Sequence, residues 1–260
     1  MTAPPDSGMR VVRTALQVLE TVSDLQPVGV SAIARATGIP KSSVQRCLVS
    51  LREAGWLAPA PRDPQRWTLT GRALAVGLRG FAEAGLREAA MAVMQDLRDE
   101  TRETIHLIGF GPDHATDSAA VVVDRLESPE PVRTWVRLGT RVSLHASASG
   151  RAMLSRLPQD EVDRLLAGPL ERFSDRTLVD RDALAADLQA VRERGYATAE
   201  QSWRAGVGAV AAAVVGADDR PVGAIAISVP LQRFDADRAR TLGPVVAAAA
   251  ARVTAALTRP

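Results

Sequence analysis

The residues best suited to chemistry lie in the stretch Val30 to Ala54, whose second half carries polar side chains at helical spacing. Its apolar members, spaced i, i+3, i+4 and i+7, are Val44, Cys47, Leu48 and Leu51. Such spacing gathers them on one buried face of a helix. The side chains left facing outward are Lys41, Ser42, Ser43, Gln45, Arg46, Ser50 and Arg52. Arg and Gln can pair with base edges and Lys and Ser with phosphates, so this face suits a DNA major groove, although a solvated helix carries the same residue types.

Two short helices joined by a tight turn must position that face. Gly38 suits the left-handed residue that ends the first helix, and Ser31 is placed to cap its start. Pro40 fits the first turn of the second helix, where a missing N–H costs nothing. Two strand-like pieces, Trp56–Ala58 and Arg66–Thr70, follow around a tip that bears Pro and Arg, which is typical of a β-hairpin. The order helix, turn, helix, hairpin predicts a winged helix-turn-helix.

One further helix is expected before this motif, over Met9–Asp24. Its apolar positions at helical spacing are Val12, Ala15, Leu16, Leu19 and Val22. The helix would pack behind the other two, with Arg13 placed either to contact a DNA backbone or to lie in solvent. A single cysteine, Cys47, excludes a disulfide within the chain and suits a reducing compartment; a small core residue and a redox sensor are its alternative roles.

The rest of the chain predicts an α+β domain with a largely antiparallel sheet. The expected strands are Thr104–Phe110, Ala119–Leu126, Val132–Leu138, Tyr196–Thr198, Gly208–Val215 and Gly223–Val229. The expected helices are Gly71–Ala84, Leu86–Thr101, Ser149–Arg156, Gln159–Ala167, Asp180–Arg194 and Asp235–Thr258.

Residue types for catalysis are scarce. The histidines are His106, His114 and His145, and no G-x-S-x-G motif is present. His145 precedes Ser147 and Ser149 and could form a nucleophile and base pair with one of them, but a structural or ligand-contacting histidine is the alternative that we favour. One Cys and three dispersed His give no metal-ligand spacing, so no catalytic residue, metal or cofactor is expected.

Charge is unevenly distributed along the 260 residues, although the formal net charge is only +2. Residues 1–80 contain ten Lys and Arg against five Asp and Glu, whereas the remainder is slightly acidic. Positive charge thus falls on the segment expected to meet phosphates. The N-terminus lacks the apolar core of a signal peptide, and the apolar runs are too short to span a bilayer, so we expect no membrane association and a cytoplasmic location.

Seven segments, in order along the chain, resemble the IclR family of bacterial transcriptional regulators. The first three are VVRTALQVLE (residues 11–20), ATGIPKSSVQRCLVSLREAGWL (36–57) and RWTLTGRAL (66–74). The other four are ETIHLIGF (103–110), LHASASGRAML (144–154), DRDALAADLQAVRERGYA (180–197) and AIAISVPLQRF (224–234). The resemblance implies a winged helix-turn-helix domain at 9–71, a linker helix at 72–85 and a GAF-like effector-binding domain at 86–260. The family's A-P-V strand motif reads AAVV at residues 212–215, a departure that concerns one strand edge.

The resemblance also implies the partners. They are a double-stranded DNA operator, a small-molecule effector, and further copies of the chain in a homodimer or a dimer of dimers, acting as a repressor rather than an activator. The DNA-contacting residues are expected to be Lys41, Ser42, Ser43, Gln45, Arg46, Arg13, Arg62 and Arg66.

The family holds a small carboxylate through backbone amides that match Ala148 and Ser149, and through polar side chains at four positions of this chain. These positions are Ala199, Ala209, Ala226 and Ser228, of which only Ser228 keeps a polar group. The expected effector-binding residues are Val142, His145, Ala148, Ser149, Ala199, Ala209, Ala226 and Ser228. Three alanines imply a wider, more apolar pocket, which favours an aromatic or acyl acid. An enzyme on this domain and a DNA-binding protein without an effector remain the alternatives.

Overall fold

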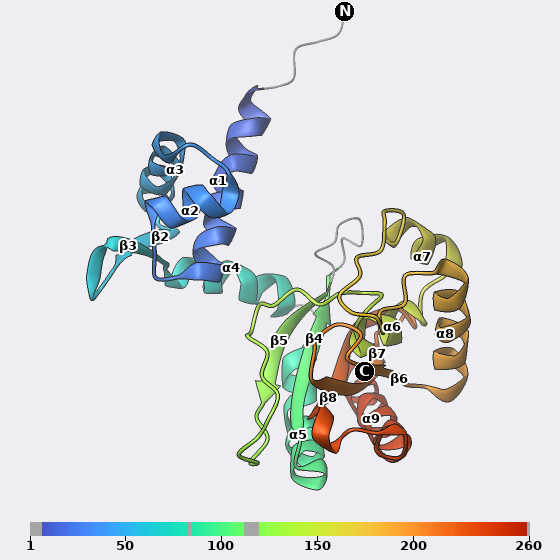
Figure 1. Cartoon of the computed structure of the whole chain (residues 1–260). Coiled ribbons are helices and arrows are strands. Elements are labelled where there is room, and N and C mark those ends of the chain that lie inside the picture. Colours follow the sequence, from blue (N-terminus) through green and yellow to red (C-terminus); the bar gives the residue numbers. More distant parts are fainter. Residues whose placement is uncertain (1–6, 83–84, 112–119, 259–260) are drawn as a thin grey trace, which may run out of the picture. The chain divides into compact units, whose positions relative to one another are not determined.

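A computed structural model describes residues 7–82, 85–111 and 120–258 (Figure 1). The chain divides into two compact units, residues 1–83 and 84–260. Each unit is described by itself below. Some residues named above lie outside the described residues. They are His114, Ala119 at the start of a predicted strand, and residues 83 and 84 of the predicted linker.

The first unit packs three helices against a small antiparallel sheet. Its elements are α1 (Ser7–Leu25), β1 (Val28–Gly29), α2 (Val30–Thr37), α3 (Lys41–Glu53), β2 (Leu57–Ala60), β3 (Asp63–Leu69) and α4 (Gly71–Ala82). The strand order is β1-β3-β2, so β2 and β3 form the predicted hairpin and β1 extends it. The core residues are Val18, Val22, Val28, Ile33, Val44, Leu48, Leu51, Leu57 and Trp67. The winged helix-turn-helix is confirmed.

Local details of this unit correct three predictions. Gly38 has the expected left-handed conformation, with φ of 72°, but α2 begins at Val30 and its N-cap is Gly29, so Ser31 does not cap it. Pro40 is the N-cap of α3 and directly precedes its first turn. The apolar stripe of α1 turns inward at Val18 and Val22, and Val12 and Leu16 are exposed. Strand β1 was not predicted, because two residues carry no periodicity.

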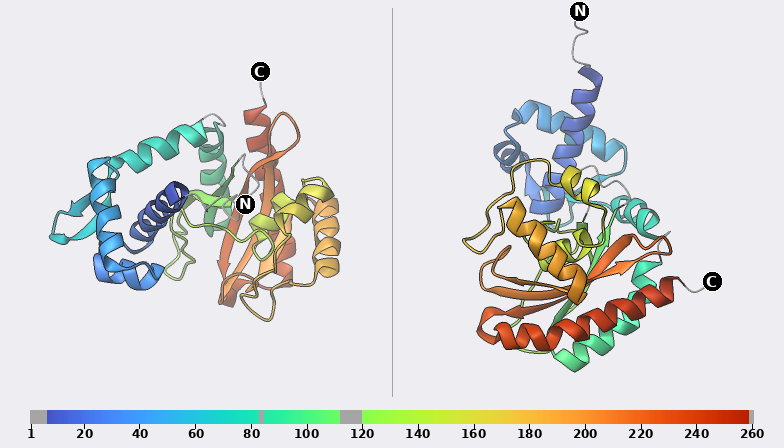
Figure 2. Two further views of the ribbon diagram at one scale, coloured as in Figure 1. Left: turned by 90° about the horizontal axis from the view of Figure 1, so that it is seen from above. Right: turned by 90° about the vertical axis from the view of Figure 1, so that its right-hand side faces the viewer.

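The second unit is a five-stranded antiparallel sheet with helices on both faces (Figures 1 and 2). Its strands are β4 (Thr104–Phe110), β5 (Ala120–Leu126), β6 (Ala197–Glu200), β7 (Val207–Val215) and β8 (Pro221–Pro230), in the order β5-β4-β8-β7-β6. Its helices are α5 (Leu86–Thr101), α6 (Ala148–Leu154), α7 (Gln159–Leu165), α8 (Arg181–Arg194), the 3-10 turn η1 (Leu231–Arg233) and α9 (Ala236–Leu257). The α+β class and the antiparallel sheet agree with prediction.

Two apolar cores lie on opposite faces of this sheet. Helices α5 and α9 cover one face, where Met94, Ile105 and Val246 are fully buried. Helices α6, α7 and α8 cover the other face, with Met153, Leu154 and Ala224 in its core. Because successive side chains of a strand point to opposite faces, strands buried on both sides read as continuous apolar runs, as in β4 and β8.

The predicted strand Val132–Leu138 is wrong. The segment is irregular, and its Val132, Trp135 and Leu138 are exposed whereas Val136 is buried. Its backbone is held by a side chain rather than a strand, since Nη1 of Arg125 donates to the carbonyl of Val136 at 2.5 Å. Alternating apolar residues suggested a strand, but the pattern alone does not supply a neighbouring strand to pair with.

Candidate functional site

The outer face of α3 has the composition that the sequence predicted. Val44, Leu48 and Leu51 are buried, and the exposed side chains are Lys41, Ser42, Gln45, Arg46, Ser50 and Arg52. Ser43 is half-buried, and its hydroxyl accepts a hydrogen bond of 3.4 Å from Nη2 of Arg46. Neither Lys41 nor Arg46 is paired with a carboxylate among the described residues. These donors are therefore available to a partner.

Cys47 is half-buried against the core of the unit. Burial raises the pKa of its thiol, with a smaller opposing effect from Arg46. A thiol that stays protonated is a poor nucleophile, so its environment supports a packing role and gives no support to redox sensing.

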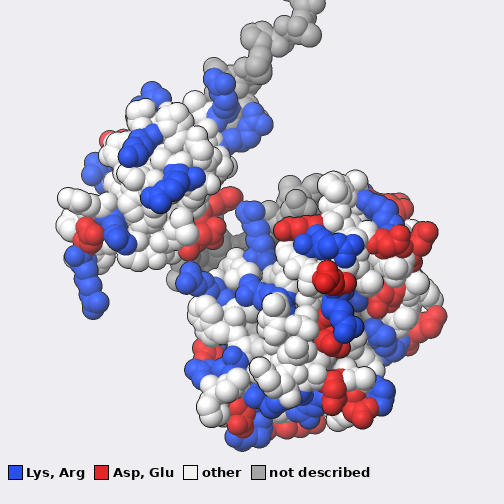
Figure 3. All heavy atoms as spheres, in the orientation of Figure 1, with Lys and Arg blue, Asp and Glu red and all other residues white. Residues whose placement is uncertain are grey.

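The hairpin places its two arginines differently. Arg62 lies in the two-residue turn between β2 and β3 and is exposed. Arg66 is also exposed, but its Nη1 donates to the carbonyl of Pro27 at 3.2 Å and its Nε lies 3.2 Å from Oδ2 of Asp63. Arg13 is exposed on α1. On the face seen in Figure 3, basic side chains predominate on this unit, whereas both signs are mixed on the other.

A cavity lies in the second unit against the face of the sheet that α6 covers. It has about 520 Å³ of empty space, part of it open to solvent. Its lining residues are His106, Ile108, Val122, Val136, Val142, Ser147, Ala148, Ser149, Ala199, Ser202, Trp203, Arg204, Val207, Ala209, Ala226 and Ser228. Seven of the eight residues predicted to bind an effector are among them. The lining is mainly apolar, as the three alanines implied.

Two side chains that were not predicted supply most of the polar character of this cavity. His106 is 3% exposed, and its Nδ1 lies 3.2 Å from Oγ of Ser228. Its Nε2 is buried and has no hydrogen-bond partner in the described structure. Burial above all, and then the charges of Arg125 and Arg204, lower the pKa of His106 to about 4. The imidazole is therefore neutral near pH 7.

Arg204 lies in the turn between β6 and β7, with its guanidinium 4.5 Å from the ring centroid of Trp203. Its Nε is buried and has no hydrogen-bond partner in the described part of the chain, and burial lowers the pKa of the Arg204 side chain. The loop that carries it is anchored, because Oγ of Ser202 donates to the carbonyl of Ala146 at 2.7 Å. No periodicity marks a loop arginine, so nothing in the sequence distinguished this residue.

Helix α6 forms one wall of the cavity and is fixed at both ends. Ser147 is its N-cap, with Oγ accepting from N of Gly150 at 2.9 Å. A Cβ at Gly150 would lie 2.3 Å from the carbonyl oxygen of Leu144, so this position requires glycine. Further along, Nη1 of the buried Arg151 contacts Oδ2 of Asp187 at 2.7 Å and ties α6 to α8.

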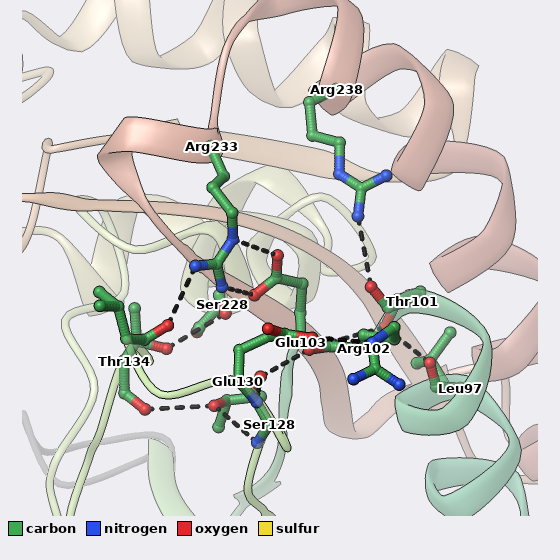
Figure 4. Close-up of polar contacts among 12 residues, drawn as sticks. Leu97, Thr101, Arg102, Glu103, Ser128, Glu130, Thr134, Ser228, Arg233 and Arg238 are labelled. Carbon is green, nitrogen blue, oxygen red and sulfur yellow. Dashed lines mark hydrogen bonds and ion pairs between the residues drawn. The ribbon is translucent and has the colours of Figure 1, made fainter.

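A polar cluster fixes the irregular segment that follows β5 to the ends of β4 and β8 (Figure 4). Oγ1 of Thr134 donates to the carbonyl of Ser228 at 3.1 Å, next to the cavity. Arg233 donates to both carboxylate oxygens of the buried Glu103, at 3.1 and 2.7 Å, and to the carbonyl of Val132. The cluster therefore holds the wall that carries Val136 in place.

His145 lines a second, neighbouring pocket rather than this cavity. Its Nδ1 lies 3.3 Å from Oγ of Ser143, and its Nε2 lies 2.8 Å from the carbonyl oxygen of Glu171. Ser147, the proposed nucleophile, caps α6 and donates to the carbonyl of Ser143. Both ring nitrogens thus have structural partners, and the structure does not pair His145 with Ser147 or Ser149.

The described part of the chain shows no sign of a metal site or a membrane span. No group of three His, Cys, Asp or Glu side chains there could hold a metal ion. Among the same residues, no helix has both the length and the apolar character needed to cross a bilayer.

Comparison with known proteins identifies both units. A family model described as the bacterial transcriptional regulator IclR C-terminal domain matches residues 80–255, and one described as the IclR helix-turn-helix domain matches residues 11–61. The chain is 32% identical over 226 residues to the probable transcriptional regulator SauR of Cupriavidus necator, covering 86% of this chain and 87% of that protein. It is 26% identical over 257 residues to the transcriptional repressor IclR of Escherichia coli, covering 98% and 92%.

A solved structure shares the fold of the chain. It is an IclR homologue from Microbacterium hydrocarbonoxydans complexed with 4-hydroxybenzoate, with a TM-score of 0.76, 23% identity, and coverage of 95% of this chain and 98% of that one. The family models together match most of this sequence, in the predicted order of helix-turn-helix and C-terminal domain. The chain belongs to the IclR family of bacterial transcriptional regulators.

Proposed function

We propose that this regulator is a cytoplasmic repressor that binds a double-stranded DNA operator and changes its affinity when a small organic acid occupies the cavity of its C-terminal domain. The observation that carries the DNA-binding part is the exposed face of α3, where Lys41, Gln45 and Arg46 have no competing acidic partners among the described residues. In this proposal α3 enters the major groove.

The residues proposed to contact DNA have separate tasks. Gln45 and Arg46 contact base edges, while Lys41, Ser42 and Ser43 at the start of α3 contact phosphates. Arg62 extends from the hairpin turn and is the stronger wing candidate, because Arg66 already contacts Pro27 and Asp63. Arg13 on α1 completes the phosphate contacts.

A second copy of the chain is proposed as the partner of α1. Val11, Val12 and Leu16 are exposed on this helix, at 66%, 57% and 51%. A contiguous exposed apolar face is unusual on a monomer and marks an interaction surface. A homodimer, alone or paired into a dimer of dimers, would place two α3 helices in successive major grooves of a pseudo-palindromic operator.

The proposed effector site is the cavity lined by Val142, Ala148, Ser149 and the residues Ala199, Ala209, Ala226 and Ser228. Its apolar lining suits an aromatic or acyl acid. His145 lies in the neighbouring pocket and is proposed only as support for the wall, through its contact with Glu171. The 4-hydroxybenzoate bound by the Microbacterium relative provides a first probe.

The proposed domain organisation is a DNA-binding domain at 9–71, a linker helix at 72–85 and an effector domain at 86–260. Helix α4, which carries Gly77, belongs to this linker. Ligand occupancy would act on DNA through it, and coupling between such sites typically amounts to about 1 to 3 kcal/mol.

Footprinting of the full-length protein on the DNA upstream of its gene, at several salt concentrations, tests this function. We expect a protected region with two half-sites about one or two helical turns apart. Arg46→Ala should lose the protection, and Glu53→Gln, at the end of α3, serves as the matched control. Diffuse binding that only weakens with salt would contradict operator recognition.

A further inference from the structure

The cavity contains two polar groups whose hydrogen-bonding capacity the protein does not use. Nε2 of His106 and Nε of Arg204 are both buried, and neither has a hydrogen-bond partner among the residues that the structure describes. Both side chains line the same cavity, and the charge of Arg204 is one of the causes that lower the pKa of His106. Buried polar atoms in native proteins normally have partners, so two such atoms in one cavity favour a partner from outside the protein.

Arg204 differs from the other cation that acts on His106. Arg125 has protein partners, since its Nη1 donates to Val136 and its Nη2 lies 2.9 Å from Oε1 of Glu127. The side chain of Arg204 forms no ion pair or hydrogen bond among the described residues, and its guanidinium lies over the face of Trp203. An Arg guanidinium cannot lose its proton in a protein, so its charge must be balanced by an anion or by water.

The remaining lining restricts the rest of the ligand. Ile108, Val122, Val136 and Val142 come from the sheet and from the segment before α6, and Ala199, Ala209 and Ala226 add only methyl groups. Such walls bind an apolar body by excluding water and offer it no further charge. A second carboxylate on the ligand would therefore be desolvated without a partner.

We infer that the cavity binds a monocarboxylic acid with an aromatic or aliphatic body, that Arg204 holds its carboxylate, and that Nε2 of His106 forms a hydrogen bond with a polar group of the same ligand. His106 does this as a neutral imidazole whose orientation is set by Ser228. Arg204 is held towards the cavity by its anchored loop, in which N of Gln201 donates to the carbonyl of Val207 at 2.8 Å. Because this assignment rests on the proposed effector site, its test must separate the two.

Titration calorimetry of the full-length protein with three acids and their primary amides makes that separation. The probes are benzoate, 4-hydroxybenzoate and phenylacetate, each compared with its amide. We expect the acids to bind about 10- to 100-fold more tightly than the amides, because only the acids form a charged hydrogen bond with Arg204. Arg204→Gln should abolish this preference by weakening the acids alone.

Two further variants of the cavity and one control test the roles of the individual side chains. Arg204→Lys keeps the charge but loses the planar fork and should bind the acids with intermediate affinity. His106→Gln should weaken 4-hydroxybenzoate more than benzoate if the ligand's hydroxyl reaches Nε2. Arg156→Gln removes an exposed arginine after α6 that does not line the cavity, and should change neither acid nor amide binding. Melting curves of every variant confirm that it is folded.

The assignment is overturned if acids and amides bind wild-type protein equally, if Arg204→Gln binds the acids normally, or if none of the six probes binds. The proposed function has its own readout, which is operator affinity. A neutral probe that alters operator affinity would preserve the effector-controlled repressor while refuting the role of Arg204. Operator affinity that no probe changes, in a protein that nevertheless binds acids through Arg204, would confirm the assignment and refute the effector control.

Discussion

The outer face of α3 and the cavity of the C-terminal domain both present unpaired donors, but their environments differ. Lys41 and Arg46 are exposed, so water solvates their charges at no cost to stability. His106 and Arg204 each bury a nitrogen atom that has no hydrogen-bond partner within the described residues. The contrast indicates that an unoccupied α3 face costs the fold little, whereas a ligand in the cavity would offer partners to buried nitrogen atoms.

The largest loss of stability is expected from replacing Arg151, a buried charge that the protein balances with its own groups. Arg151 is 5% exposed and pairs with Asp187, and it also donates to the carbonyl of Thr198. Arg151→Ala should destabilise the C-terminal unit by about 3 to 5 kcal/mol, because it leaves Asp187 and the wall of the cavity unsupported. Denaturant unfolding measures this, and a loss below about 1 kcal/mol would show that the pair does not hold α6.

On the outer face of α3, substitution of Arg46 should change DNA binding without changing the stability of the protein. Arg46→Ala should reduce operator affinity by about 1 to 3 kcal/mol and relax the preference for one base pair. Its melting temperature should match wild type, since Arg46 is exposed and contacts only Ser43. Fluorescence anisotropy on operator and scrambled DNA provides the measurement. Equal loss on both DNAs would make Arg46 a phosphate contact instead of a base contact.

Lowering the pH should reduce the stability of the C-terminal unit, because of the shifted pKa of His106. Its pKa of about 4 in the folded protein lies below the value of about 6.5 in an unfolded chain, so between these values the unfolded state binds the proton more strongly. Stability is therefore complete above about pH 6.5 and falls as the pH drops towards 4, by about 1 kcal/mol between pH 7.5 and 5.5. His106→Gln should flatten this part of the profile in urea unfolding at several pH values. A profile unchanged by the substitution would mean that other groups cause it.

The smallest predicted effect is an increase in stability. Arg204→Met removes an unpaired guanidinium from the cavity and should raise the melting temperature of the ligand-free protein by about 1 to 2 °C. The same variant should lose the stabilisation that benzoate gives wild type. Thermal melts with and without benzoate measure both, and a melting temperature that falls by several degrees would show that Arg204 is structural.

The two regions also differ in how far the sequence predicted them. The α3 face comes from one continuous helix, so the spacing of Val44, Leu48 and Leu51 sufficed to assign its outer residues. The cavity joins residues of all five strands, of α6 and of the loops between them, and seven of its residues were named only because the chain resembles a family. His106 lies in an apolar strand and Arg204 in a loop, so neither had a periodicity to distinguish it.

The irregular segment after β5 shows that prediction of the fold from local sequence is limited in the same way. Val132–Leu138 has the composition of a strand, but whether a strand forms depends on a partner edge elsewhere in the sheet. Side-chain contacts hold this segment instead, through Arg125, Thr134 and Arg233. Long-range contacts of this kind leave no mark in local sequence, whereas Leu86–Thr101 was predicted to the residue from its own pattern.

Operator affinity measured with and without saturating acid, in wild type and in Arg204→Gln, tests the central claim that the two regions are coupled. The proposal predicts that 4-hydroxybenzoate or benzoate changes the operator affinity of wild type by about 5- to 150-fold. Arg204→Gln should bind the operator like wild type without acid and show no response to it. An operator affinity that stays the same with the cavity saturated would contradict the account, because a ligand that favours neither state of the protein cannot regulate it.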